Sequence, residues 1–227
     1  MERLAPGPLP LSAGALRLLS LINPALLVLG AAWIGTVLAP RVGLDAPVVR
    51  LALAGASPVP VLRHQARLAV WAGLGTGLLL AGYAIATGPY FQSLGTEATS
   101  RLQALTPPFA TRLLYGGIAE EILARWGVMT LGSWLVLRLL GRPAVPAAGV
   151  YWIGIMTAAL VFALAHLPFL YSVAGNPPLW LAMGATAING LAGAVFGWLF
   201  WRRGLEAAMM AHTLAHVTAA LIGIAAA

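Results

Sequence analysis

The longest uncharged stretch of the chain runs from Pro143 to Trp201 and contains no Asp, Glu, Lys or Arg. A helix that crosses a bilayer needs about 20 predominantly apolar residues, so this stretch is long enough for two crossings. Asn176-Pro177-Pro178 lies near its middle and is typical of a turn between two helices. The stretch therefore predicts a pair of membrane-spanning helices rather than part of a water-soluble domain.

The composition of the whole chain indicates the same solvent. Hydrophobic residues make up 60% of the chain and charged residues 8%, with a mean hydropathy of +0.89, which leaves too little polar surface for a soluble domain. The formal net charge is +7, from 13 basic residues against 6 acidic ones. Because the basic residues are arginines that separate hydrophobic runs, we predict the lipid bilayer, and no nucleic acid, as a partner. The absence of cysteine excludes disulfide and thiolate chemistry.

Apolar stretches of spanning length recur along the chain and predict an all-α, polytopic transmembrane helical bundle of about six spans. The predicted spans are 18–38, 68–87, 107–140, 147–167, 179–201 and 205–224, the third beginning at the helix-start signature Thr106-Pro107-Pro108 and the fourth ending near Pro168. Residues 1–105 would form an N-terminal region of two spans joined by an interfacial helix or loop, and residues 106–227 a second helical bundle. Two Gly-x-x-x-Gly motifs, Gly73 to Gly77 and Gly193 to Gly197, predict faces that a neighbouring helix can approach closely.

The distribution of arginine between the loops predicts an orientation. The loops after the first, third and fifth predicted spans hold most of the arginines, including Arg142 and Arg202. By the positive-inside rule these loops are cytoplasmic, so both chain ends are expected outside. We predict an integral protein of a bacterial-type inner (plasma) membrane.

Two of the six acidic residues stand side by side in the third predicted span, as Glu120 and Glu121. An ionised side chain within a membrane is costly and is a functional-site hypothesis by default. Glu121 and Arg125 are four residues apart on one helical face and are predicted to form a buried ion pair. Glu120 is rotated by about 100° from that face and would be free for chemistry. Gly116 and Gly117 precede it and leave room for a helix, water or substrate; the alternative is a packing network with no catalytic role.

Histidine is the second residue type that carries chemistry here. His166 lies at the end of the fourth predicted span, one turn after Phe162, and His212 and His216 lie four apart on one face of the sixth. Two imidazoles at this spacing could bind one ion or donate to one oxyanion. The remaining histidine, His64, lies in an arginine-rich loop and is predicted to be solvated.

Three short segments occur in order on successive hydrophobic stretches: EEILAR at Glu120, FALAH ending at His166, and HTLAH beginning at His212. They resemble the three motifs of the CPBP family of intramembrane proteases, also called the CAAX protease, bacteriocin-processing or Abi family. The family pattern is Glu-Glu-x-x-x-Arg, then Phe-x-x-x-His, then His-x-x-x-Asn or Asp. The resemblance covers about residues 107–224 and implies that residues 106–227 form a CPBP-like catalytic helical bundle.

Residue roles follow from the resemblance. It implies an intramembrane endopeptidase in which Glu120 and His166 activate a water that hydrolyses a peptide bond of a membrane-associated peptide or protein. His212 and the residue at position 216 would stabilise the oxyanion, and Glu121 and Arg125 would hold the glutamate helix as a structural ion pair. The last family position differs, since His216 stands where Asn or Asp is usual.

The histidine at position 216 also allows a metal-dependent mechanism. The set of Glu120, His166, His212 and His216 could bind a divalent metal such as zinc, whereas a glutamic-type protease needs no cofactor. We favour the glutamic type, with no cofactor, because no glutamate base follows His212 as it would in a zincin. Other functions weighed for the chain are a non-catalytic CPBP-fold membrane scaffold or bacteriocin immunity protein, and a proton-coupled carrier.

Overall fold

The computed structural model describes residues 12–141 and 146–225, and this part of the chain is helical without strands. The first span is α1 (Ala13–Leu38), and the 3₁₀ helix η1 (Ala39–Val42) and α2 (Pro47–Leu53) connect it to the second, α3 (Val59–Ser93). α4 (Gly95–Leu105) follows the second span. The third span comprises α5 (Phe109–Thr111), the π-helical segments η2 (Arg112–Ala119) and η3 (Ile122–Met129), and α6 (Thr130–Leu139). The remainder comprises α7 (Ala148–Ala165), α8 (Leu167–Ala174), α9 (Leu179–Arg203) and α10 (Leu205–Ala225).

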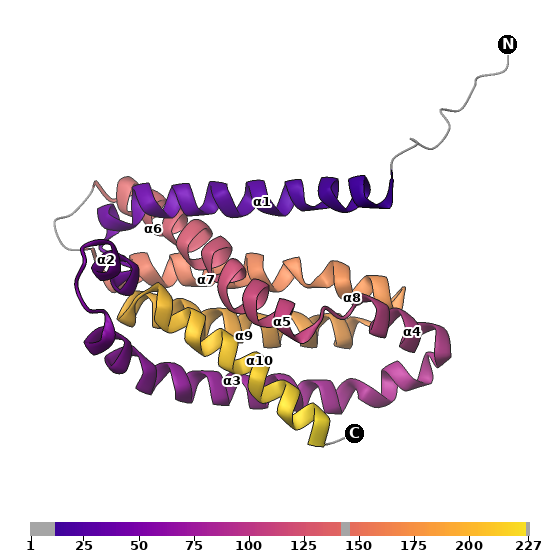
Figure 1. Ribbon diagram of the computed structural model, residues 1–227. Helices are drawn as coiled ribbons and strands as arrows, with labels where there is room; N and C mark the ends of the chain where they lie inside the picture. The colour runs from indigo at the N-terminus through magenta and orange to yellow at the C-terminus, as the bar shows by residue number, and fades with distance from the viewer. Residues whose placement is uncertain (1–11, 142–145, 226–227) are drawn as a thin grey trace, which may run out of the picture.

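Six helical segments are long and apolar enough to cross a membrane, which confirms the predicted bundle. α1 lies along one edge of the bundle and α3 along the opposite edge, with α7 and α9 between them (Figure 1). α10 crosses this arrangement obliquely and packs on α3, α9 and η2. Since η2 leads directly to Glu120, this crossing brings the last helix of the chain against the glutamate segment.

The two Gly-x-x-x-Gly motifs pack as predicted. A Cβ atom built on Gly73 or on Gly77 would lie 2.7 Å from a backbone carbonyl oxygen of α10. A Cβ on Gly193 would lie 3.0 Å from the Cα of Ala159 in α7. Glycine at these positions therefore lets α3 approach α10, and α9 approach α7, at backbone distance. These two close pairs fix the position of α10 and α9 relative to the rest of the bundle.

The third span begins differently from the prediction. Thr106 does not cap the span, because its Oγ1 donates to the carbonyl of Leu102 and so closes α4. The helix begins after Pro108, whose ring fixes a backbone angle suited to that position. Beyond it, η2 and η3 flank Glu120 and Glu121. Such π-helical turns are rare and are frequent at functional sites.

The fourth span is longer than predicted. α7 ends at Ala165, but α8 continues it from Leu167, so the span reaches Ala174. Pro168 does not end the span, because it occupies the first turn of α8, where its missing N–H needs no partner. As a result His166 lies at a helix junction within the span, whereas the sequence placed it at the end.

Candidate active site

The glutamates and histidines predicted from the sequence as site residues come from three spans. Glu120 and Glu121 lie between η2 and η3, His166 at the junction of α7 and α8, and His212 and His216 on α10. Oε2 of Glu120 lies 4.0 Å from Nε2 of His212, although the two residues are far apart in the chain. The bundle thus brings the glutamate segment and α10 together around these side chains.

The two neighbouring glutamates have different surroundings. The side chain of Glu121 is 0% exposed, whereas that of Glu120 is 23% exposed. Nη1 of Arg125 lies 3.1 Å from Oε1 of Glu121, and the Arg125 side chain is also 0% exposed. Glu121 is therefore enclosed with a compensating charge, and Glu120 is the more accessible of the two carboxylates.

Arg125 contacts two neighbouring helices, α7 and α9. Its Nη2 donates to the backbone carbonyl of Gly193 at 2.9 Å. Its guanidinium lies 4.9 Å from the centre of the Phe162 ring and 5.5 Å from that of Phe196, distances at which a cation is attracted to an aromatic face. These contacts join η3 to α7 and α9.

His212 has a fixed orientation. Its Nδ1 lies 2.8 Å from Oε1 of Glu121, and because a carboxylate accepts, Nδ1 carries the proton. Its ring is stacked between Phe196, at 4.7 Å between centroids, and His216, at 4.9 Å. Nε2 is left on the side of Glu120. Glu121 therefore orients His212 as well as pairing with Arg125.

His166 also has one nitrogen committed. Its Nδ1 donates at 2.7 Å to the backbone carbonyl of Phe162, and its ring packs 4.6 Å from the Phe162 ring. A carbonyl oxygen only accepts, so Nδ1 carries the proton and Nε2 of the neutral ring has a free lone pair. The helix break after Ala165 and this hydrogen bond together fix the position of that lone pair.

His216 lies where α10 crosses η2. Its Nε2 occupies the space that a Cβ on Gly116 would need, and Oγ1 of Thr213 does the same at Gly117. The two glycines therefore admit α10, one of the alternatives predicted for them. The Nε2 atom of His216 is buried and has no hydrogen-bond partner in the part of the chain that the structure describes.

The arrangement of these side chains does not fit a metal ion. Across residues 12–141 and 146–225, no group of three His, Cys, Asp or Glu residues is placed to hold one. The rings of His212 and His216 are stacked with an angle of 22° between their planes. Ligand lone pairs lie in the plane of an imidazole, so two stacked rings direct them side by side rather than toward one point.

Two contributions to this site were missed by sequence reasoning. Phe196 lies between the glycines of the α9 motif and packs against both His212 and Arg125, but an aromatic residue in a span carries no signal of its own. Gly193 was predicted only as a packing residue, yet its carbonyl accepts from Arg125. Backbone acceptors of this kind leave no trace in a sequence.

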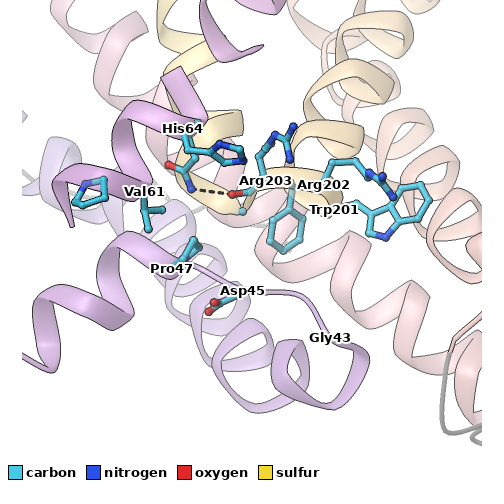
Figure 2. A pocket seen from close by; sticks show the side chains of 12 residues that line it. Gly43, Asp45, Pro47, Val61, His64, Trp201, Arg202 and Arg203 are labelled. Carbon is cyan, nitrogen blue, oxygen red and sulfur yellow. Dashed lines mark hydrogen bonds between the residues drawn. The ribbon is translucent and has the colours of Figure 1, made fainter. Parts of the chain in front are cut away.

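A separate cavity of about 460 Å³ lies between the loop after η1, the start of α2, the start of α3 and the end of α9 (Figure 2). His64, Arg202 and Arg203 line it, and none of the five residues named above for the site does. His64 is exposed as predicted, but it lies on α3 rather than in a loop, because α3 begins at Val59. The cavity is therefore distinct from the glutamate and histidine cluster.

A comparison with known protein families matches the part of the chain that contains this cluster. Residues 102–218, a little more than half of the 227, match the model of the Rce1-like family, described as type II CAAX prenyl endopeptidase Rce1-like. The chain belongs to this family. The match contains all three motifs and confirms the resemblance drawn from them; family membership supports an intramembrane endopeptidase with a peptide substrate. No curated protein and no solved structure matches the chain.

Proposed function

We propose that this Rce1-like protein hydrolyses a peptide bond of a CAAX-type, membrane-associated substrate through a water activated by Glu120 and His166. One observation carries the proposal: of two adjacent glutamates inside the family match, only Glu120 is accessible, and it faces Nε2 of His212 at 4.0 Å. A general base must reach water, and a buried carboxylate paired with arginine cannot serve.

In the proposed reaction, Glu120 takes a proton from water while the water oxygen bonds to the carbonyl carbon of the scissile bond. His166 accepts a hydrogen bond from the same water through its free Nε2, which positions it. When the tetrahedral intermediate collapses, the carbon–nitrogen bond breaks and Glu120 returns the proton to the leaving amine. Atoms and charge balance without a further reactant.

The developing oxyanion needs donors, and His212 is the first candidate. Because its Nδ1 already donates to Glu121, His212 can donate from Nε2 only as an imidazolium. The buried carboxylate of Glu121 stabilises that cation, as a buried acid does for a catalytic histidine in other hydrolases. We propose His216, in the family's Asn or Asp position, as the second donor.

The proposed chemistry is of the glutamic type. The stacked rings of His212 and His216 support it, because their lone pairs do not converge. The test is the His216→Asn variant, which restores the family's usual amide. We expect it to retain most of the activity, with neither parent nor variant losing activity to a chelator. A stoichiometric metal in the parent, lost together with activity in the variant, would establish a metalloprotease.

The proposal as a whole is tested with Glu120→Gln, which keeps the shape of the side chain and removes the base. Loss of a general base typically costs about 100- to 10,000-fold in rate, so cleavage of a prenylated CAAX peptide in detergent should fall by that factor. Glu97→Gln is the matched control, since Glu97 is exposed on α4 and paired with Arg101. Equal activity of parent and Glu120→Gln would remove Glu120 from the mechanism.

We also propose that the protein lies in a bacterial-type inner membrane with Arg142 and Arg202 on the cytoplasmic side. The arginine count supports this orientation. Single cysteines introduced at the two positions can be labelled with an impermeant reagent, and the cysteine-free chain gives a clean background. Labelling of either position on intact cells would show that the orientation is the reverse of the one proposed.

A further inference from the structure

Arg112 is a cation inside the third span, and the mechanism proposed above gives it no role. Its side chain is partly buried, and its guanidinium lies 5.6 Å from the centre of the Phe109 ring. Its Nε atom is buried without a hydrogen-bond partner, and no carboxylate of residues 12–141 or 146–225 lies within ion-pair distance. An unpaired charge at such a position is expensive and marks a functional site.

The position of Arg112 relative to the site is defined by η2. Gly116 follows Arg112 by one turn and packs against His216. Arg112 precedes Glu120 by eight residues, which is about two turns of the π-helical segment η2. Because it lies one turn before Gly116, which packs against His216, Arg112 is on the side of the third span that meets α10.

The substrate class supplies a charge close to the scissile bond. A CAAX motif is the last four residues of its protein, so any bond within it lies at most three residues from the terminal carboxylate. Three extended residues span about 10 Å. When the scissile carbonyl is at Glu120, the free chain end can therefore extend along η2 as far as the neighbourhood of Arg112.

We infer that Arg112 binds the α-carboxylate at the C-terminus of the substrate and so makes the enzyme selective for bonds close to a free chain end. The inference rests on the proposed endopeptidase function and names the residue that recognises the end of its CAAX-type substrate. A guanidinium offers paired N–H donors that match the two oxygens of a carboxylate. Within a span, where water is scarce, the pair is screened less than at a surface.

The experiment compares two forms of one farnesylated CAAX peptide, with a C-terminal acid or a C-terminal amide. In the parent we expect kcat/KM for the acid to exceed that for the amide by about 10- to 100-fold, the usual worth of a hydrogen bond to a charged group. In Arg112→Gln that ratio should fall to near one. Arg112→Lys should restore part of the preference.

Arg101→Gln is the control, because Arg101 lies on α4 near the same end of the bundle but is exposed and paired with Glu97. It should keep the parent's preference for the acid. Equal cleavage of acid and amide by the parent would overturn the role of Arg112 while leaving the endopeptidase intact. A parent that cleaves neither peptide would instead count against the proposed function.

A binding measurement tests Arg112 without turnover. In the Glu120→Gln background, the same uncleaved peptide acid should raise the melting temperature more than the amide does, and adding Arg112→Gln should abolish the difference. An acid and an amide that stabilise equally would overturn the inference even if the enzyme proved inactive for another reason.

Discussion

Glu121 and Glu206 are both buried carboxylates, but the protein stabilises them in different ways. Glu121, in the middle of the third span, has Arg125 at 3.1 Å and the Nδ1–H of His212 at 2.8 Å. Glu206, which is 9% exposed in the first turn of α10, has no cation within ion-pair distance among the residues that the structure describes. It accepts instead from the backbone N–H of Val49 at 3.0 Å and from Nε2 of Gln65 at 3.3 Å.

The difference follows from the depth of the two groups in the bundle. Val49 lies in the first turn of α2, where backbone N–H groups lack partners within the helix, so Glu206 satisfies one of them. Glu206 also sits at the start of its own helix, where the dipole favours negative charge. At a helix end, neutral donors and dipoles are sufficient. In the middle of a span no helix end is present, and a carboxylate needs a full countercharge.

The largest effect is expected from breaking the Glu121–Arg125 pair. Replacing either residue by alanine leaves its partner charged and buried, so each variant should lose about 3–5 kcal/mol of unfolding free energy. The double variant should lose less than the sum, because neither charge is left unpaired. The measurement is unfolding in detergent followed by circular dichroism. Additive losses would mean that the pair does not act as one unit.

A smaller effect is expected for Glu206→Ala. The substitution leaves the N–H of Val49 without an acceptor, at about 1–3 kcal/mol for an unsatisfied buried group. Nε2 of Gln65 loses one of its two acceptors and still donates to the carbonyl of Arg203 at 2.8 Å. Peptide cleavage per folded molecule should not change, since Glu206 lies outside the glutamate and histidine cluster. A loss of stability as large as that of Glu121→Ala would contradict the proposed difference between the two carboxylates.

The smallest effect is expected for Glu206→Gln. The amide oxygen can still accept from Val49, but the amide nitrogen that replaces the other oxygen cannot accept from Gln65. The charge at the helix ends and one hydrogen bond are lost, about 1 kcal/mol in all. Glu121→Gln should cost several times more, because it leaves Arg125 without a countercharge. Comparing the two glutamines by thermal unfolding in the same detergent measures the need for charge directly. Equal shifts would show that both carboxylates depend on hydrogen bonds alone.

The membrane spans could be predicted from the sequence because apolar length alone decides them. All six were found, but two boundaries were wrong for a local reason. Thr106 and Pro168 were read as a start and a stop, and each signal has a second outcome: a threonine can close the preceding helix, and a proline can begin the next one. Which outcome occurs depends on where the neighbouring helices lie, and only the three-dimensional structure shows their positions.

The sequence by itself determined the spans, the three motifs and the spacing of four that puts Glu121 beside Arg125, because these depend on neighbours along one helix. The tertiary structure alone decided that Nδ1 of His212 donates to Glu121, that Phe196 covers the ring of His212, and that His166 lies within its span. Those contacts join α10, α9 and the junction after α7 to the third span. They depend on how closely glycine lets the helices approach, which a pattern along the chain does not specify.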